Sequence, residues 1–166
     1  MSSDATEFFV DAETIKKSPL GQELSDGQCT ALARVVSAQG LEKGMFLLEE
    51  GHKDDSIYVV TSGVLEVVKP VGGGDWITLH ILREGDMAGA LGFIDDVEHS
   101  AGIRALGNTE VFSLARQDLE GFLRTDPDLV YKVMRGIVRT VHGILQRMNM
   151  QYVEMSNYIT KQHGRY

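Results

Sequence analysis

The chain has 166 residues, of which 43% are hydrophobic and 24% charged, and its formal net charge is −8. This composition is typical of one globular domain with a hydrophobic core, and the length leaves little room for a second. The net acidity disfavours a large nucleic-acid surface, and no apolar run reaches the roughly 18 residues that a membrane-spanning helix needs.

Glycine is enriched in the middle of the chain. Of 18 glycines, 12 lie between Gly40 and Gly107, and hydrophobic runs separate them. We therefore expect many tight turns in this region rather than a flexible linker.

The reactive side chains exclude several kinds of site. Cys29 is the single cysteine, so neither an intrachain disulfide nor a Cys-based zinc or iron–sulfur site is expected. His80 and His99 have no partner at metal-binding spacing, and no nucleophile and base are paired, so we expect no metal and no catalysis. The polar, acidic start of the chain has no signal-peptide core, and a cytoplasmic location is expected.

The first predicted elements are helical. Residues 1–23 form a lead-in that is loose or contains a short helix. Ser25 and Gln28 have the spacing of a capping box and predict that a helix begins there. We expect Leu32, Val35 and Val36 to form its apolar face and Gly40 to end it.

The central region predicts antiparallel β-structure. Short runs rich in β-branched and aromatic residues recur about every ten residues, and Gly or Asp turns bound them. No helix of crossover length separates them, which argues against a parallel α/β sheet and favours a sandwich or barrel. The predicted strands are Met45–Leu48, Ile57–Val60, Val64–Val68, Trp76–Leu79 and Val111–Leu114.

The last part of the chain is helical again. A short helix carries Leu119, Phe122 and Leu123, and a long one starts at Pro127 and reaches about Tyr158. Apolar residues follow each other along the long helix at alternating steps of four and three, a pattern named here the heptad stripe. The heptad stripe consists of Met134, Val138, Val141, Leu145, Met148, Tyr152, Met155 and Ile159.

Two interpretations of the heptad stripe remain open. It docks on the β-domain, as we expect of the first half of the helix through Val130, Val133 and Ile137, or it forms a seam with a second copy. The length of the repeat favours a homodimer. Residues 127–166 carry six Lys and Arg side chains against two acids, a charge of +4 that leaves −12 on residues 1–126. Because two such helices repel each other, the seam must depend on apolar contacts.

A glycine-containing segment between two predicted turns is the candidate binding site. Gly89 and Gly92 bracket a short turn whose backbone N–H groups can face an anion, and His99, Ser100 and Ala101 follow it. Charge, hydroxyl and N–H together can hold a phosphate. The alternative is that these are ordinary turn glycines and a satisfied loop hydroxyl.

The order of the motifs resembles the cyclic nucleotide-binding domain. The segments that carry the likeness are 40–51, 55–67, 82–86 and 89–105, and it covers roughly residues 24–145. The resemblance implies an antiparallel β-roll of the jelly-roll type with eight strands, short flanking helices and a long C-terminal helix that dimerises in the bacterial regulators. It places the phosphate-binding cassette on residues 89–101, in which Gly89, Leu91, Ser100 and Ala101 fit the family pattern.

Two anchor positions of that cassette differ. By resemblance, Ala90 stands where the family has the Glu that binds the ribose hydroxyl, and His99 where it has the Arg that pairs with the cyclic phosphate. The resemblance also implies base contacts from the long helix near Thr140, Ile144 and Leu145. Loss of two charged hydrogen bonds of about 1.5–3 kcal/mol each weakens affinity by roughly two to three orders of magnitude.

We therefore expect three parts: a lead-in (1–23), a cyclic-nucleotide-binding-like β-roll (24–126), and a helix with a short tail (127–166). The expected function is a dimeric sensor for a nucleotide-like or other phosphate-bearing ligand that signals to a protein partner. The alternatives are a ligand-free interaction scaffold and a true cyclic AMP or cyclic GMP receptor. Too few residues follow the helix for a recognition helix, so no DNA or membrane partner is expected.

Overall fold

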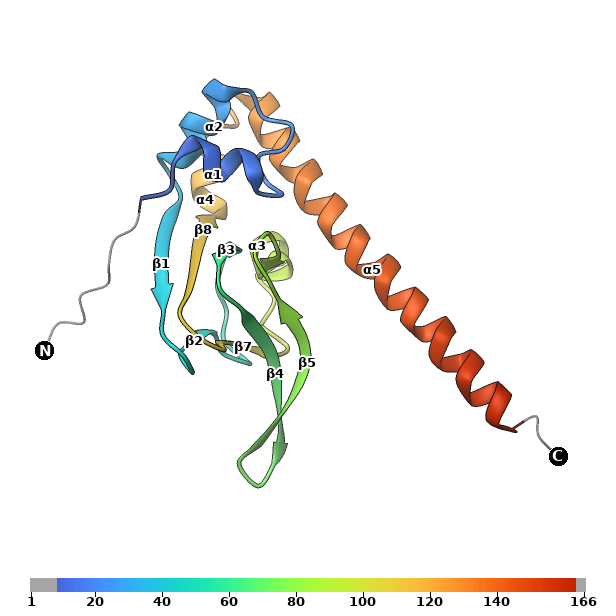
Figure 1. Cartoon of the computed structure of the whole chain (residues 1–166). Coiled ribbons are helices and arrows are strands. Elements are labelled where there is room, and N and C mark those ends of the chain that lie inside the picture. The colour runs from blue at the N-terminus through green and yellow to red at the C-terminus, as the bar shows by residue number, and fades with distance from the viewer. Residues whose placement is uncertain (1–8, 164–166) are drawn as a thin grey trace, which may run out of the picture.

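The computed structural model describes residues 9–163, which form a β-roll with helices at one end and a long helix that leaves it (Figure 1). The roll consists of two antiparallel four-stranded sheets, with strand orders β1-β8-β3-β6 and β2-β7-β4-β5. The expected antiparallel roll is confirmed. The strands are β1 (Ser37–Leu41), β2 (Phe46–Leu48), β3 (Ser56–Ser62), β4 (Leu65–Gly72), β5 (Asp75–Leu82), β6 (Met87–Ala88), β7 (Gly102–Ala105) and β8 (Thr109–Ala115).

All five predicted strand segments fall in β2, β3, β4, β5 and β8, but three strands were not predicted. One correction concerns Gly40, which does not end a helix. Helix α2 (Asp26–Ala33) stops earlier, and Gly40 lies within β1, opposite Glu110 of β8. Pairing with a central strand outweighs the weak helical pattern of the polar Ser37–Leu41 segment. Strands β6 and β7 are too short or too polar to show a period of two.

The described part of the lead-in, residues 9–23, packs as part of the domain. Helix α1 (Ala12–Lys17) buries Ile15, and Leu20 and Leu24 join the same core as Phe112 and Leu114 of β8. Gly21 permits this packing, since a Cβ there would lie 2.1 Å from the main-chain oxygen of Ile15. The predicted capping box is confirmed, because Ser25 Oγ accepts from Gln28 N and Gln28 Oε1 accepts from Ser25 N.

A second core fills the interior of the roll. It is formed by buried side chains from both sheets, and Tyr58 is partly buried against it. Its fully or nearly fully buried members are Leu41, Leu48, Val60, Leu65, Leu82, Ala88, Ile103, Ala105 and Val111. The two sheets are thus held together by apolar contacts from β1 to β8.

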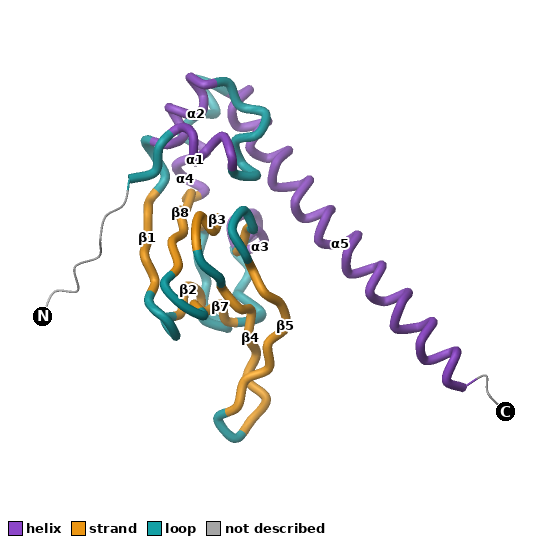
Figure 2. Tube along the Cα trace, in the orientation of Figure 1, coloured by secondary structure: helices purple, strands orange, loops and turns teal. Residues whose placement is uncertain are grey.

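Helix α5 (Pro127–His163) follows the short α4 (Arg116–Glu120) and runs away from the roll (Figure 2). It starts at the predicted Pro127 and extends past the expected end near Tyr158. Its 37 residues span about 55 Å at 1.5 Å per residue. As expected, its first half docks on the domain: Val133 and Ile137 are buried and Val130 is partly buried, while Leu129, which was not predicted, is also buried. No helix in the described part of the chain is long and apolar enough to span a membrane.

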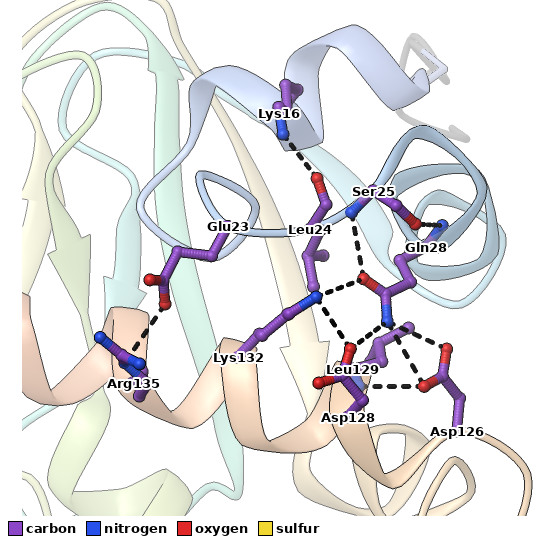
Figure 3. Close-up of polar contacts among 10 residues, drawn as sticks. All are labelled: Lys16, Glu23, Leu24, Ser25, Gln28, Asp126, Asp128, Leu129, Lys132 and Arg135. Carbon is purple, nitrogen blue, oxygen red and sulfur yellow. Dashed lines mark hydrogen bonds and ion pairs between the residues drawn. The ribbon is translucent and has the colours of Figure 1, made fainter.

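Polar contacts fix the start of α5 to α2 (Figure 3). Asp126 Oδ1 accepts from Leu129 N at 3.1 Å and caps the helix. Gln28 Nε2 donates to Asp128 Oδ2 at 3.0 Å, and that carboxylate also pairs with Lys132 Nζ at 2.8 Å. Hydrogen bonds from Lys132 first, and then from Gln28, lower the pKa of Asp128.

Candidate functional site

The predicted cassette begins where β6 meets a short helix, α3 (Ala90–Asp95). Gly89 separates them with φ of +84°, and a Cβ there would lie 2.8 Å from the main-chain oxygen of Ser56. Only glycine fits both the left-handed backbone and this close approach. Gly89 therefore fixes the angle at which α3 leaves β6 and lies against β3.

A second close contact joins α3 to the loop that follows it. A Cβ on Gly92 would lie 2.8 Å from the main-chain oxygen of Asp54 and 3.3 Å from Cε1 of His99. The cassette positions Gly89 and Gly92 thus both lie against the start of β3, and Gly92 also contacts the His99 imidazole. Both glycines have a packing role beyond the turn.

His99 is held firmly by its main chain. Its N–H donates to His52 O at 2.9 Å, and its carbonyl accepts from Gly51 N at 2.8 Å. Its Nε2 atom is buried and makes no hydrogen bond within the described part of the chain. A buried polar atom without a partner is rare in native proteins, and it is a position where a ligand atom can supply the missing bond.

The other cassette residues differ in exposure. Ala90 is partly buried against the larger core, whereas the Leu91 side chain is 69% exposed. Ser100 is exposed, and its carbonyl accepts from Lys69 Nζ at 3.1 Å. Ala101 is partly buried at the start of β7. Lys69 thus brings a positive charge to the end of the cassette that sequence reasoning did not identify.

No hydrogen bond in the described part of the chain links the predicted α5 residues to the cassette. Thr140 Oγ1 donates to Gly136 O, one turn earlier in its own helix, at 3.0 Å. Thr140 instead lines a cleft of about 250 Å³ between α5 and Pro19, Glu23, Gly85 and Asp86. Ile144 lies one turn further along α5 and is partly buried.

The heptad stripe changes environment along the helix. Met134 and Val141 pack against the domain core and are partly buried. The remaining members are at least half exposed: Val138, Leu145, Met148, Tyr152, Met155 and Ile159. Tyr131, seven residues before Val138, is also exposed and extends the pattern towards the start of α5.

Two side chains outside the cassette support it, and neither was predicted from the sequence. Tyr58 of β3 donates to Asp54 Oδ2, and burial first, then this hydrogen bond, raises the pKa of Tyr58. Arg116, after β8, donates to Phe93 O at 3.3 Å and to Asp96 Oδ1 at 2.9 Å, at the end of α3. The hydrogen bond to Asp96 is the main cause that raises the pKa of Arg116.

Arg104 of β7 pairs with a buried carboxylate. Its Nε donates to Glu66 Oε1 at 2.5 Å, and Thr78 Oγ1 donates to Glu66 Oε2 at 2.7 Å. Glu66 is only 6% exposed, so its charge is taken up within the sheet. These two donors, Arg104 first, lower the pKa of Glu66.

Residues 38–126, more than half of the chain, match the family model of the cyclic nucleotide-binding domain. This chain belongs to that family. The resemblance found from the motifs is thereby confirmed. Members are typically regulatory rather than catalytic. Among residues 9–163, no three His, Cys, Asp or Glu side chains are grouped so that they could hold a metal ion.

Individual relatives agree in fold and differ in length. An uncharacterized NTE family protein of Mycobacterium tuberculosis is 32% identical over 133 residues, which are 78% of this chain and 22% of that protein. The cyclic AMP receptor protein of Thermus thermophilus is 25% identical over 125 residues, which are 75% of this chain and 58% of that one. The chain thus spans about a fifth of the mycobacterial relative.

The solved structure of a cyclic nucleotide-binding domain from Methylobacillus flagellatus has a TM-score of 0.76 to this chain at 21% identity. The superposition covers 87% of this chain and 82% of that one. At this identity the likeness establishes the fold, including the flanking helices and the long last helix.

Proposed function

We propose that this chain is a regulatory sensor module that binds a small phosphate-bearing ligand, nucleotide-like but not cyclic AMP, at residues 89–101. The observation that carries the proposal is the buried, unpartnered Nε2 of His99 inside an otherwise well-packed cassette. An anionic ligand oxygen would supply its missing hydrogen bond.

The ligand differs from cyclic AMP because both anchor positions have changed. Ala90 offers no carboxylate to a ribose hydroxyl, and a single imidazole donor cannot replace the bidentate fork of an Arg on a phosphate. Cyclic AMP should then bind roughly two to three orders of magnitude more weakly than to a cassette with both anchors. The name of the Thermus relative supports a nucleotide-related ligand without defining this one.

Occupancy is passed on through α5 to a protein partner, and the module acts as a homodimer. The exposed half of the heptad stripe supports the dimer, since a row of apolar side chains on a helix that leaves its domain is typical of a coiled-coil seam. A ligand that binds one arrangement of cassette and α5 more tightly than another would shift the population between them.

Titration calorimetry with a panel of cyclic mononucleotides, cyclic dinucleotides and linear nucleotides tests the proposal. We expect one phosphate-bearing compound to bind. His99→Ala should weaken the binding of that compound by about tenfold or more, because the variant cannot supply the hydrogen bond from Nε2. Micromolar binding of cyclic AMP would contradict the altered specificity and make the chain a true receptor.

A gain-of-binding variant distinguishes a pocket of altered specificity from a pocket that no longer binds any ligand. Ala90→Glu combined with His99→Arg should restore cyclic AMP binding by about two orders of magnitude, if the rest of the cassette is competent. His52→Arg, in the adjoining turn, adds the same charge outside the cassette and should restore nothing. Silence across the panel for the unaltered chain would favour the ligand-free scaffold and overturn the sensor.

A further inference from the structure

A groove on the outer face of the second sheet is not used by the proposed sensor. It has a volume of about 620 Å³, and its lining side chains are Phe46, Glu49, Glu50, His52, Pro70 and Trp76. We call it the Trp76 groove. The rings of Phe46 and Trp76 lie with centroids 5.5 Å apart at an interplanar angle of 48°, and they form an apolar floor.

Trp76 is held in place from within the sheet. The Arg104 guanidinium lies 5.6 Å from the centroid of the Trp76 ring, and Glu66 neutralises the Arg104 charge at 2.5 Å. The indole therefore already has one guanidinium against its ring. The carboxylate that neutralises this guanidinium, Glu66, is buried and does not line the groove. Trp76 nevertheless stays 42% exposed, so part of the ring remains accessible.

Two carboxylates lie at the rim of the groove. Glu49 is 3.1 Å from His52 Nδ1, and Glu50 is 3.8 Å from Lys69 Nζ, while their side chains are 59% and 36% exposed. Lys69 is the one cation paired with either carboxylate among the described contacts, and it also donates to Ser100 O. The rim therefore keeps a net negative charge in a part of the chain that is itself strongly acidic.

The shape of the site suits a polypeptide. Strand β5 is at the edge of its sheet, next to β4 alone in the strand order. Besides Trp76, its exposed side chains include Ile77 and Leu79. An extended segment can follow such an edge and place one side chain in a neighbouring pocket.

We propose that the Trp76 groove binds a segment of another protein through an Arg or Lys side chain. The alkyl part of that side chain would cover the aromatic floor, and its charge would face Glu49 and Glu50. Arg should bind better than Lys, because its planar guanidinium stacks on indole and pairs with carboxylates. The proposal does not depend on whether the cassette binds a ligand.

Trp76 is the single tryptophan of the chain, so its fluorescence reports on this groove alone. The probes are acetyl-Gly-Arg-Leu-Arg-Gly-amide and its counterparts with Lys or Glu in place of Arg. We expect a saturable change with the Arg peptide, a weaker one with the Lys peptide, none with the Glu peptide, and weaker binding at higher salt. Glu49→Gln with Glu50→Gln should weaken the Arg peptide about three- to tenfold.

The matched control is Glu84→Gln with Glu154→Gln, which removes two exposed carboxylates that do not line the groove and should leave binding unchanged. Calorimetry on Trp76→Ala, where the fluorescent group is lost, should show no binding. Equal affinity of the groove variant and the unaltered chain would overturn the proposal. Trp76 emission that changes when the protein is diluted, but not when either basic peptide is added, would also overturn the proposal. That result would show that a second copy of the chain occupies the groove.

Discussion

Tyr58 is a partly buried phenol whose hydroxyl donates a hydrogen bond to Asp54 at the point where β3 meets the cassette. Burial first, and the hydrogen bond second, raise its pKa in the folded chain. In the unfolded chain the phenol titrates near its usual value of about 10. The folded state therefore holds this proton more tightly, so its contribution to stability is complete below about pH 10 and is lost as the pH rises above that value.

We predict that the free energy of unfolding of the parent falls more steeply above about pH 10 than that of Tyr58→Phe. The difference approaches about 1.4 kcal/mol per pH unit, and at neutral pH the variant is about 1 kcal/mol less stable. Urea unfolding at a series of pH values measures both. Burial also raises the pKa of Cys29, but both proteins share that contribution. The exposed Tyr152→Phe should follow the parent, and a parallel decline in Tyr58→Phe would contradict the prediction.

The pair of Glu66 and Arg104 makes a second prediction at this scale. Arg104→Met leaves a carboxylate that is only 6% exposed without its cation, and should cost about 2–3 kcal/mol of unfolding free energy. Arg104 lowers the pKa of Glu66, so the stabilisation is complete above the unfolded value of about 4.3 and is lost as the pH falls further.

The destabilisation by Arg104→Met should therefore shrink in acid, because Glu66 then becomes neutral in both proteins. Chemical unfolding at neutral and acid pH is the measurement. Arg124→Met, at an exposed position after α4, is the control and should change stability by less than about 0.5 kcal/mol. A cost of Arg104→Met that does not depend on pH would show that the guanidinium acts through packing on Trp76 alone.

These residues also show which contacts could not be predicted from the sequence. The cassette was found because Gly89, Leu91, Ser100 and Ala101 keep a fixed spacing along the chain. The partners of its supporting residues lie far away in sequence: Arg116 contacts Asp96, and Arg104 contacts Glu66. A single sequence has no periodic signal for such pairs, since strand register sets them. The buried Nε2 of His99 was likewise invisible before His52 and Gly92 were placed around it.

At the scale of elements, the sequence predicted the helices and strands that have strong patterns and missed those that have weak ones. The capping box at Ser25 and Gln28 and the proline at the start of α5 predicted two helix starts that the structure confirms. Strand β1 was taken for the end of a helix, because Ser37, Gln39 and Gly40 lack the apolar alternation of a half-buried strand. Its place is set by pairing with β8, a contact between segments more than sixty residues apart.

Two glycines seven residues apart in α5 give a matched prediction. A Cβ on Gly136 would lie 2.3 Å from the main-chain oxygen of Pro19, whereas one on Gly143 would meet nothing within 4 Å. Gly136→Ala should displace the lead-in from α5 and destabilise the domain by about 1–3 kcal/mol. Gly143→Ala should stabilise it by up to about 1 kcal/mol through helix propensity.

Thermal and urea unfolding of the two variants, made in one background, test this pair. Hydrogen exchange adds a local readout, because loosening at Gly136 should speed exchange in α1 and the first turns of α5. The ion pair of Glu23 with Arg135 (Figure 3) lies at the same contact and should weaken with it, as should the ion pair of Glu23 with Arg139. Equal changes in unfolding free energy for Gly136→Ala and Gly143→Ala would contradict this prediction. They would mean that the lead-in moves away from α5 without a loss of stability.

At the scale of the whole molecule, the net negative charge lies on residues 1–126 and the net positive charge on the segment that contains α5. The first half of α5 belongs to the domain core through Leu129, Val133 and Ile137. Its second half extends from the domain and presents the exposed members of the heptad stripe (Figure 1). Since a positive helix repels its own copy, the dimer that we propose has to form by apolar burial along this stripe.

The last prediction concerns that association. Leu145→Asp places a charge in the centre of the heptad stripe and should raise the dimer dissociation constant by at least about a hundredfold, because a carboxylate buried without a partner costs several kcal/mol. Met150→Asp is the control: Met150 is 65% exposed against 52% for Leu145 but lies off the stripe, and the substitution adds the same charge to the same helix. Sedimentation equilibrium over a range of concentrations measures both, with 18.3 kDa as the mass of one chain. An unaltered chain that sediments as a monomer at tens of micromolar, or a Met150→Asp variant that dissociates as readily as Leu145→Asp, would contradict a seam built on this stripe.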